Sequence, residues 1–457
     1  MGGSRRATLF LCALVGVALS GCRSTKETLR DYESSLVAGK FAPAAAEMSR
    51  LADEGGRDEL CWQLNAAAAQ RLAGDNDEAI RRFDIAEDLF SDEDGRGSVA
   101  KAGTAAYSMM TGDYAVPYPA TGQDRVFACL YKAIDFGLLG RPAAVRTELN
   151  RAMLHQSNWL SERSAEMAAA DERMRRDASD ASKAGDADLS RYGMATNRVF
   201  ADASFSAKLG AGAGFDPQRS GRLDLLSESD YVNAYLLNVN EIFRRNVGDS
   251  GPKPKDRVTV FVEDGLCPCR DEWRLDLPMF LVPGLGRYAQ YVGMALPKLR
   301  YRNAAVTGYS VTAAGQALPL TEIQDVDRLV RTEFDVAFRG ALCREIARAV
   351  VKVGAQAVLG AAAKQSRGGD AELLFLALQA GVSVYSYCTT EADVRSWTAL
   401  PKKVYMIDLP RPADGVVQVN CGLETVRLNA PSGNTMAFVR KTSSAAPSVV
   451  KLFTLPN

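Results

Sequence analysis

The sequence contains a single histidine, His155, among its 457 residues. This histidine follows Arg151 by one helical turn, in a context where histidine more often packs against a neighbouring helix than acts as a base. One histidine excludes the His-rich zinc sites found in many cell-wall peptidases. It also excludes a histidine-based triad from the C-terminal half of the chain, unless the two halves meet.

Net charge and long apolar runs are also lacking. The chain has 55 basic and 55 acidic residues, and loss of a signal that contains Arg5 and Arg6 would leave a net charge of about −2. This balance gives no indication of a nucleic-acid partner. Beyond the N-terminus the longest apolar run, Leu373 to Cys388, is too short for a membrane span and is interrupted by Gln379. We expect a buried helix there.

The N-terminus carries the most specific signal. Two arginines precede an apolar stretch from Ala7 to Leu19, which ends in Leu19-Ser20-Gly21-Cys22. This ending resembles the lipobox of bacterial lipoproteins, in which the cysteine receives diacylglycerol before the signal is cut. We predict a signal peptide at residues 1–21 and lipidation of Cys22. An ordinary signal peptide or an N-terminal transmembrane anchor is the alternative.

Lipid is therefore the expected membrane anchor. A mature lipoprotein of this kind carries several acyl chains, and two or more chains anchor a protein stably. Arg23 follows the cysteine, in place of the aspartate that typically signals retention in the inner membrane. We therefore expect an outer-membrane lipoprotein that faces the periplasm.

Disulfide pairing is open. The chain has nine cysteines, of which Cys12 lies in the signal and Cys22 is the predicted lipidation site. The periplasm permits disulfides, but an odd number of remaining cysteines leaves at least one unpaired, and their connectivity does not follow from sequence. The remaining cysteines are Cys61, Cys129, Cys267, Cys269, Cys343, Cys388 and Cys421.

Residues 22–160 carry the pattern of helical hairpins. Gly39-Lys40-Phe41 recurs as Gly74-Asp75-Asn76 with an offset of 35 residues, close to the tetratricopeptide period. Glycine makes the turn between two helices, and small residues let the second helix approach the first. A third copy is predicted at Gly140-Arg141-Pro142, and the loop Val116 to Pro119 makes the array irregular. The predicted contact residues are Ala44, Met48, Leu51, Ala79, Phe83, Ala86, Val145, Leu149 and Ala152.

Two interpretations of this region remain open. Repeats of this kind usually bind an extended peptide or a partner helix in a concave face, so we expect an envelope protein partner there. The alternative is a generic helical bundle with alanine-rich seams. Residues 161–220 follow as a polar helix and a linker, in which Gly210 to Gly214 is interpreted as a flexible connector because no strand precedes it and no Lys-Ser/Thr follows it.

Residues 221–457 predict an α+β domain with a mostly antiparallel sheet, because strands, then helices, then strands follow one another. Helices are expected at Tyr231–Phe243, Ile323–Phe334, Leu342–Ala363 and from the Leu373 run to about Asp393. Strands are expected at Val258–Val262, Trp273–Leu277, Tyr291–Leu296, Val306–Val311, Val404–Ile407, Val416–Val419, Thr425–Leu428, Ala437–Val439 and Val449–Phe453.

No residue set predicts catalysis, a metal or a cofactor. Cys267-Pro268-Cys269 lacks a second pair for metal binding and the two-residue spacer of redox motifs, so these thiols are interpreted as structural or incidental. No Gly-x-Ser-x-Gly motif and no convincing Ser-x-x-Lys motif is present. The carboxylate pairs Asp325 with Asp327 and Glu391 with Asp393 are of the kind that is usually solvated.

The polar and aromatic cluster from Glu391 to Pro401 stands out more than these. It is predicted to end a helix and to lead directly into a strand. In the favoured interpretation Arg395 pairs with an acid and Trp397 packs the corner. The alternative is a partner-binding surface.

Several short motifs extend over most of the mature chain. They are the lipobox, Tyr131-Lys132-Ala133, Ala144 to Ala152, Val262 to Leu266, Leu277-Pro278, Leu296-Pro297-Lys298 and Asp393 to Pro401. In these residues the chain resembles an uncharacterised family of conserved bacterial lipoproteins with an N-terminal tetratricopeptide-like region. Cys267 and Cys269 depart from the family's pattern. Similar proteins are associated with envelope lipoproteins near activators of penicillin-binding proteins, so the resemblance implies an accessory role in the envelope and no known activity.

Three functions follow as hypotheses. The first is a lipid-anchored interaction or scaffold protein of the periplasm, whose helical repeats hold an envelope protein. The second is an envelope enzyme acting on peptidoglycan or glycan, which requires a pocket with two convergent acids of perturbed pKa. The third, and weakest, is a thiol or metal module at Cys267 and Cys269.

Replacing the predicted lipidation site tests the anchor. Because no other segment of the sequence is long and apolar enough to span a membrane, Cys22→Ala should move the protein from the membrane fraction to the soluble fraction while it stays folded. Fractionation with a salt wash, followed by circular dichroism of the soluble form, measures both. A Cys22→Ala protein that stays on membranes after the wash would contradict lipid anchoring.

Overall fold

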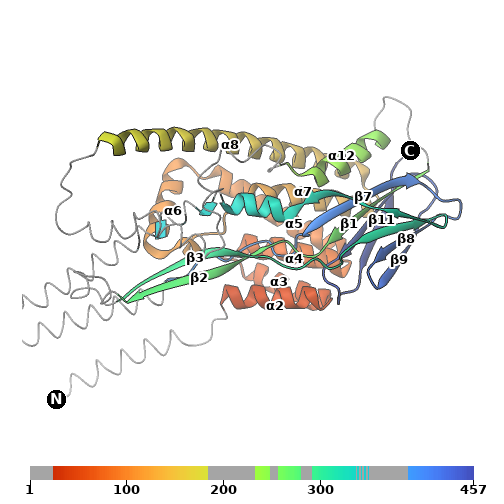
Figure 1. Cartoon of the computed structure of the whole chain (residues 1–457), viewed down its shortest axis with the longest axis horizontal. Helices are drawn as coiled ribbons and strands as arrows, with labels where there is room; N and C mark the ends of the chain where they lie inside the picture. The colour runs from red at the N-terminus through yellow and green to blue at the C-terminus, as the bar shows by residue number, and fades with distance from the viewer. Residues whose placement is uncertain are drawn as a thin grey trace, which may run out of the picture.

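A computed structural model describes residues 24–183, 232–247, 256–278, 291–335 and 390–456, together with six positions between 337 and 348. The predicted signal, Cys22, the glycines from Gly210 to Gly214 and the Leu373 run therefore lie outside the described residues. In Figure 1 helices occupy one side of the molecule and most strands the other. This arrangement confirms the predicted α+β class.

The N-terminal part is a series of antiparallel helices, and glycines make the turns between them. Gly39, Gly74 and Gly140 have φ of +71°, +92° and +68°, which only glycine adopts without strain. The glycine turns predicted from the repeat are thus confirmed. The helices are α2 (Thr25–Val37), α3 (Phe41–Glu54), α4 (Glu59–Ala73), α5 (Asn76–Gly95), α6 (Ser98–Thr111), α7 (Gly122–Leu138) and α8 (Pro142–Lys183).

The predicted helix contacts are also confirmed. Ala44 and Met48 of α3 are buried, and so are Ala79 and Phe83 of α5. The third hairpin buries Val145, Leu149 and Ala152 along α8 in the same way. Where the array becomes irregular, α6 is followed by the 3-10 turn η1 (Asp113–Ala115) and by a loop instead of a second long helix.

The described C-terminal part contains helix α12 (Ala234–Val247), a further helical segment that begins at residue 326, and three sheets. One sheet has the order β11-β10-β1-β7-β6, another β5-β4-β8-β9, and β2 pairs with β3 alone. The pair β1 with β10 is parallel and the other described pairs are antiparallel. The strands are β1 (Arg257–Asp264), β2 (Cys269–Pro278), β3 (Tyr291–Arg300), β4 (Tyr309–Ala313), β5 (Gln316–Pro319), β6 (Thr321–Asp325), β7 (Lys403–Pro410), β8 (Val416–Cys421), β9 (Glu424–Asn429), β10 (Thr435–Lys441) and β11 (Val449–Thr454).

The five-stranded sheet lies between the helices and the four-stranded sheet. Along β1, Val258, Val260 and Val262 pack against valines of β8 such as Val419. The alternate residue Phe261 faces the other way and belongs to the core that the helices share. One buried cluster therefore runs from the helical array into the sheet, so the two parts have a common core.

Several predicted elements of the C-terminal part differ from the structure. The helix expected from Ile323 begins at residue 326, because β6 takes residues 321–325 by pairing with β7. Residues 390–393 are not helical, and the amide of Ala392 donates to Glu272 Oε2 across the β2–β3 pair instead. Strand β5 was missed because its four residues are mostly exposed and lack an alternating apolar pattern.

Helix α7 and strand β11 are in close contact at Gly137. A Cβ atom added at this position would come within 2.5–2.7 Å of ring atoms of Phe453. Real contacts of this kind do not occur, so the absence of a side chain at Gly137 sets how closely helix and sheet pack. By contrast, a Cβ atom at Gly103 on α6 would meet nothing within 4 Å.

Alanine at these two glycines should have opposite effects. Gly137→Ala should lower the free energy of unfolding by about 1–2 kcal/mol, because overpacking outweighs the gain in helix propensity. Gly103→Ala should raise it by up to about 1 kcal/mol. Urea unfolding followed by circular dichroism measures both. Equal effects at the two positions would contradict the close approach.

Candidate functional site

The segment 390–400 lies on the inner side of the helical array. Arg395 is 2% exposed, and its guanidinium donates to Asp393 at 2.8 and 3.0 Å and to Asp58 at 2.9 Å. It also donates to the carbonyl oxygens of Asp113 and Val116. Burial lowers the pKa of Arg395, but the two carboxylates raise it by more. This cation therefore joins the start of α4, the η1 loop and its own segment.

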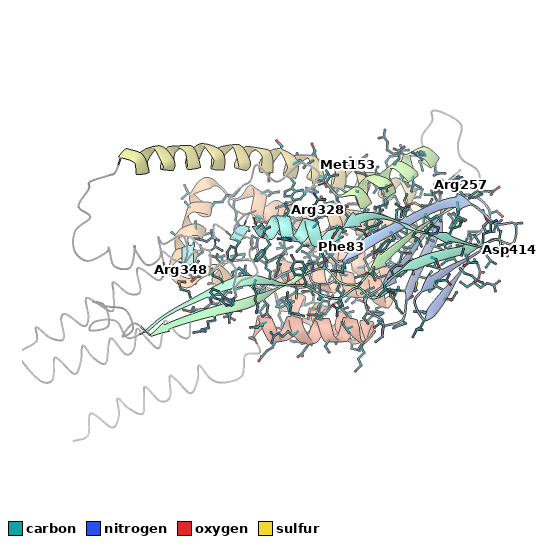
Figure 2. The ribbon with its side chains drawn as sticks, in the orientation of Figure 1. Phe83, Met153, Arg257, Arg328, Arg348 and Asp414 are labelled. Atoms are coloured by element: carbon teal, nitrogen blue, oxygen red, sulfur yellow. The ribbon has the colours of Figure 1, made fainter. Side chains whose placement is uncertain are left out.

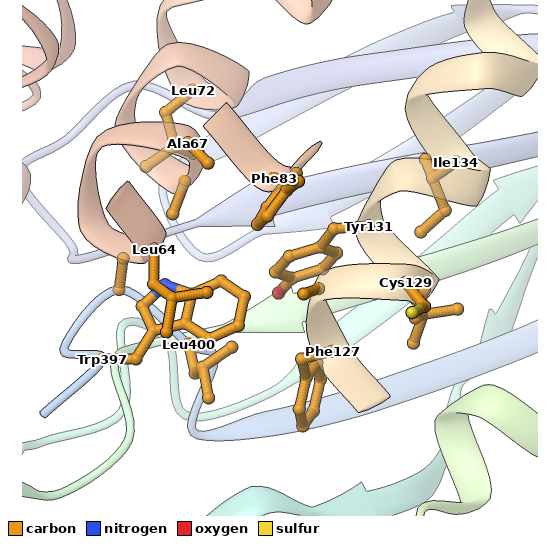
Figure 3. Packing of buried hydrophobic residues seen from close by; sticks show 14 of the residues in the cluster. Leu64, Ala67, Leu72, Phe83, Phe127, Cys129, Tyr131, Ile134, Trp397 and Leu400 are labelled. Carbon is orange, nitrogen blue, oxygen red and sulfur yellow. The ribbon is translucent and has the colours of Figure 1, made fainter. Parts of the chain in front are cut away.

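Trp397 fills the space beside it. Its ring packs at 5.8 Å from the ring of Phe83 on α5 and at 6.0 Å, edge to face, from Tyr131 on α7. Figure 3 shows Trp397 with Leu64 and Leu400 in the same cluster. The favoured interpretation of this segment, an arginine paired with an acid and a tryptophan that packs the corner, is confirmed.

Helix α4 holds the backbone of the same segment. The side chain of Asn65 donates to the carbonyl oxygen of Ser396 at 3.1 Å and accepts from the amide of Thr398 at 3.1 Å. One side-chain amide thus pairs with both an acceptor and a donor of this backbone segment. The inner face of α4, α5 and α7 is thus occupied by the protein's own chain.

A second buried charge cluster ties the sheet to the helices. Arg71 of α4 donates to Asp135 of α7 at 2.9 Å and lies 3.8 Å above the ring of Tyr131. Lys451 of β11 donates to Asp135 and to Asn76. Burial lowers the pKa of Lys451 to about 8, against the opposing effect of Asp135. These contacts leave only a small pocket of about 20 Å³ between the helices and the sheet in this region.

An open groove of about 550 Å³ lies instead at the end of the array where α6 interrupts the repeat. Helices α4, α5, α6, α7 and α8 and the loop after η1 all contribute to it, and Figure 2 shows Phe83 and Met153 within the array that it borders. The lining residues are Gly56, Arg57, Glu59, Leu60, Leu89, Glu93, Asp94, Arg96, Lys101, Thr104, Val116, Pro117, Tyr118, Pro119, Arg125 and Glu162.

The loop from Val116 to Pro119 forms a fixed wall of the groove. The Tyr118 hydroxyl donates to Asp124 Oδ2 at 2.9 Å, and its amide donates to the carbonyl oxygen of Arg57 at 2.9 Å. Burial raises the pKa of both Tyr118 and Asp124. Two prolines flank the tyrosine and limit the backbone further. The wall is therefore held in place before any ligand binds.

The groove carries charges of both signs, with four basic and four acidic side chains along it. Arg125 is engaged with Asp94 at 2.8 Å and with Glu93 at 3.3 Å. Arg96 and Lys101 are exposed, and neither forms an ion pair with another described residue. The groove therefore has two such exposed cations, Arg96 and Lys101, along its lining.

A smaller concavity of about 250 Å³ lies between β2–β3, α6 and Phe338, and its acids test the enzyme hypothesis. Asp113 is held by Arg344 and Arg348, and Asp393 by Arg395. Burial and, after it, the neighbouring Glu272 raise the pKa of Glu391, which lines the same concavity.

Hydrolysis of a glycan requires a pair of carboxyl groups of unlike pKa, both free to reach the substrate. In the described part of this concavity Glu391 is the one acid that is not paired with an arginine, so no second carboxyl group completes the pair. The other sequence-predicted carboxylates are engaged elsewhere. Asp325 accepts from the amide of Arg328 at the start of a helix, and Asp327 pairs with Lys402 while burial raises its pKa to about 6.

The remaining predicted candidates are structural. Cys267 and Cys269 are free and buried, and burial raises the pKa of Cys267 to about 12 and that of Cys269 in the same direction. Both thiols stay protonated at neutral pH, which disfavours redox or metal chemistry. His155 is half-buried on α8, where burial and then Arg125 lower its pKa, so its imidazole is neutral.

One further cluster has the composition of a metal site. Glu87, Cys129 and Glu148 place their ligand atoms within 4.8 Å of one another. Lys132, however, reaches Glu87 at 2.9 Å and Glu148 at 3.2 Å, and Arg151 contacts both carboxylates as well. Two cations already compensate these carboxylates, so the cluster is a buried ion-pair network.

Comparisons of the chain with protein-family models, with curated proteins and with solved structures found no match. Among the described residues no helix is both long and apolar enough to cross a membrane. The groove was not predicted from sequence, although the irregular loop with two prolines marked its place.

Removing the buried cation should destabilise the whole structure. Arg395→Met leaves Asp58 and Asp393 buried without their partner, which should cost about 3–5 kcal/mol of unfolding free energy. Arg257 pairs with Asp408 at 2.8 Å, and each of the two side chains is 34% exposed. Arg257→Met should therefore change the free energy of unfolding by less than about 1 kcal/mol. Urea unfolding of both variants measures this difference. A similar loss of unfolding free energy in both variants would show that Arg395 does not hold the helices and its own segment together.

Proposed function

We propose that this protein is a lipid-anchored interaction protein of the cell envelope. It is held through lipid on Cys22 at the periplasmic face of the outer membrane, and it binds a partner protein in the groove at the end of the helical array. The observation that supports the proposal is the groove itself. It is an open concavity with a fixed wall in an array whose inner face the chain already fills.

The position of this groove modifies the expectation from the repeats. Repeat arrays usually bind a peptide in the concave face, but here Trp397 and Asn65 take part in internal contacts on that face. A partner segment that bound there would have to displace the buried Arg395 and its carboxylates. The groove lined by Arg57, Lys101 and Pro117 requires no such displacement.

The lining predicts the chemistry of the ligand. Leu60, Leu89 and Pro117 offer apolar contacts. Arg96 and Lys101 offer positive charge to a carboxylate. We expect an extended polypeptide segment that carries at least one acidic and one apolar side chain. A groove with a rigid wall suits such a segment because little conformational freedom of the protein is lost when the segment binds.

Site-specific photo-crosslinking in cells tests the proposal. A photoreactive residue at Lys101 should give one discrete protein adduct. The same residue at Leu423, which is fully exposed in the turn after β8, should not give it. Adding Arg96→Glu should reduce the adduct at Lys101 several-fold, because the charge that meets the partner is reversed.

A charge reversal elsewhere is the matched control. Arg141 is 59% exposed at the start of α8 and lies outside the groove, so Arg141→Glu should leave the adduct unchanged. Two outcomes would contradict a binding groove. One is that probes at Lys101 and Leu423 crosslink to the same set of proteins, and the other is that Arg96→Glu leaves the yield of the Lys101 adduct unchanged.

A further inference from the structure

We infer that the groove binds a juxtamembrane segment, meaning the extended stretch next to the membrane-embedded part of a protein in the same membrane. This inference rests on the proposed function. It follows from the distance between the lipid anchor and the groove, a distance set by covalent geometry and by contacts of α2.

The tether between lipid and folded protein is very short. Helix α2 begins at Thr25, and Ser24 caps it by accepting from the amide of Glu27 at 3.2 Å while the Glu27 carboxylate accepts from the amide of Ser24. Only Arg23 stands between Cys22 and this cap. Two residues span at most about 7 Å. The N-terminus of α2 must therefore lie close to the lipid headgroups.

Helix α2 cannot swing away from the rest of the protein. Leu29 and Leu36 are buried in the common core, and the Tyr32 hydroxyl donates to the carbonyl oxygen of Asn65 at 2.7 Å. Arg30 and Lys26 also pair with Asp271 of β2. The orientation of the whole body relative to the membrane is thus restricted at this end.

The groove begins beside the same helix end. The Thr25 hydroxyl donates to Asp58 Oδ2 at 3.1 Å, and Asp58 precedes α4 between two groove residues, Arg57 and Glu59. These two groove residues therefore lie on the order of 20 Å or less from the headgroups. A partner segment within this distance of the membrane surface directly flanks the membrane-embedded part of that partner.

The lining favours a polypeptide over the membrane lipid itself. Glu59, Glu93, Asp94 and Glu162 all line the groove, and these carboxylates would repel the phosphates of headgroups. Their mixture with cations and with the Pro117 wall suits an extended chain that carries both charge and apolar side chains. Two partners held in one membrane also meet at high effective concentration.

Lengthening the tether tests the inference. The full lipidated protein carries the photoreactive residue at Lys101, with or without 20 Gly/Ser residues inserted between Arg23 and Ser24. Such a linker has a mean span of about 25 Å, so it lifts the groove away from the headgroups. The adduct should fall several-fold in the lengthened protein. Mass spectrometry should place the crosslink within about ten residues of a membrane-embedded segment of the partner.

The control distinguishes the effect of distance from the membrane from a loss of folding or binding. The lengthened protein should remain in the membrane fraction and should crosslink to detergent-solubilised partner as well as the original does. Unchanged adduct yield with the linker, or a crosslink on a protein without a membrane-embedded part, overturns the inference and leaves the proposed function standing. A phospholipid adduct at Lys101 also overturns it. Loss of every discrete adduct in both proteins overturns the proposed function itself.

Discussion

The structure depends on one buried guanidinium. Arg395 is a permanent cation in an environment that removes almost all of its water, and such a charge is tolerated only when carboxylates compensate it. One of these, Asp393, is two residues away, but the other, Asp58, is 337 positions earlier in the chain. The segment around Arg395 can therefore be buried only when the start of α4 is in place. This makes the helical array and the sheet a single structure in which neither side has a complete core alone.

The same constraint explains where the array is open. Because the segment 395–400 fills the inner face of the array, the open groove lies at the end where the repeat becomes irregular. There α6 and a proline-containing loop replace a regular hairpin, and helices that would otherwise close on one another leave a groove. Its charges belong to residues from five helices, of which Arg125 and Asp94 stabilise each other and Lys101 does not pair with a described residue.

Much of the fold was predictable because its signals are local. A glycine that must adopt positive φ, as at Gly39 and Gly74, and apolar residues at helical spacing depend only on neighbours in sequence. The strands from Val404 to Phe453 were predicted for the same reason. The errors arose where distant partners decide the outcome. Ile323 belongs to a strand because β7 offers a pairing edge, and residues 390–393 are not helical because Ala392 contacts β2 through Glu272.

The site was less predictable than the fold. The sequence predicted that Arg395 pairs with an acid but could not identify Asp58, since proximity of the two depends on how the halves dock. The groove joins residues from Gly56 to Glu162, and their convergence depends on the angles between helices, which no short motif determines. Cys267 and Cys269 have a weak spacing signal in an apolar context, and the structure places both thiols in buried positions.

Docking of the two halves also has a consequence for the thiols. Cys61 lies on α4, and its sulfur is 3.7 Å from the carbonyl oxygen of Ser396. The sulfur of Cys267, which follows β1, is 3.9 Å from the carbonyl oxygen of Trp397. Each thiol is therefore covered by the segment that joins the halves. In an oxidising compartment such as the one implied by the proposed export, an undocked chain would expose both to disulfide exchange. Folding and oxidation are then in competition, and rapid closure of this junction protects the chain from wrong crosslinks.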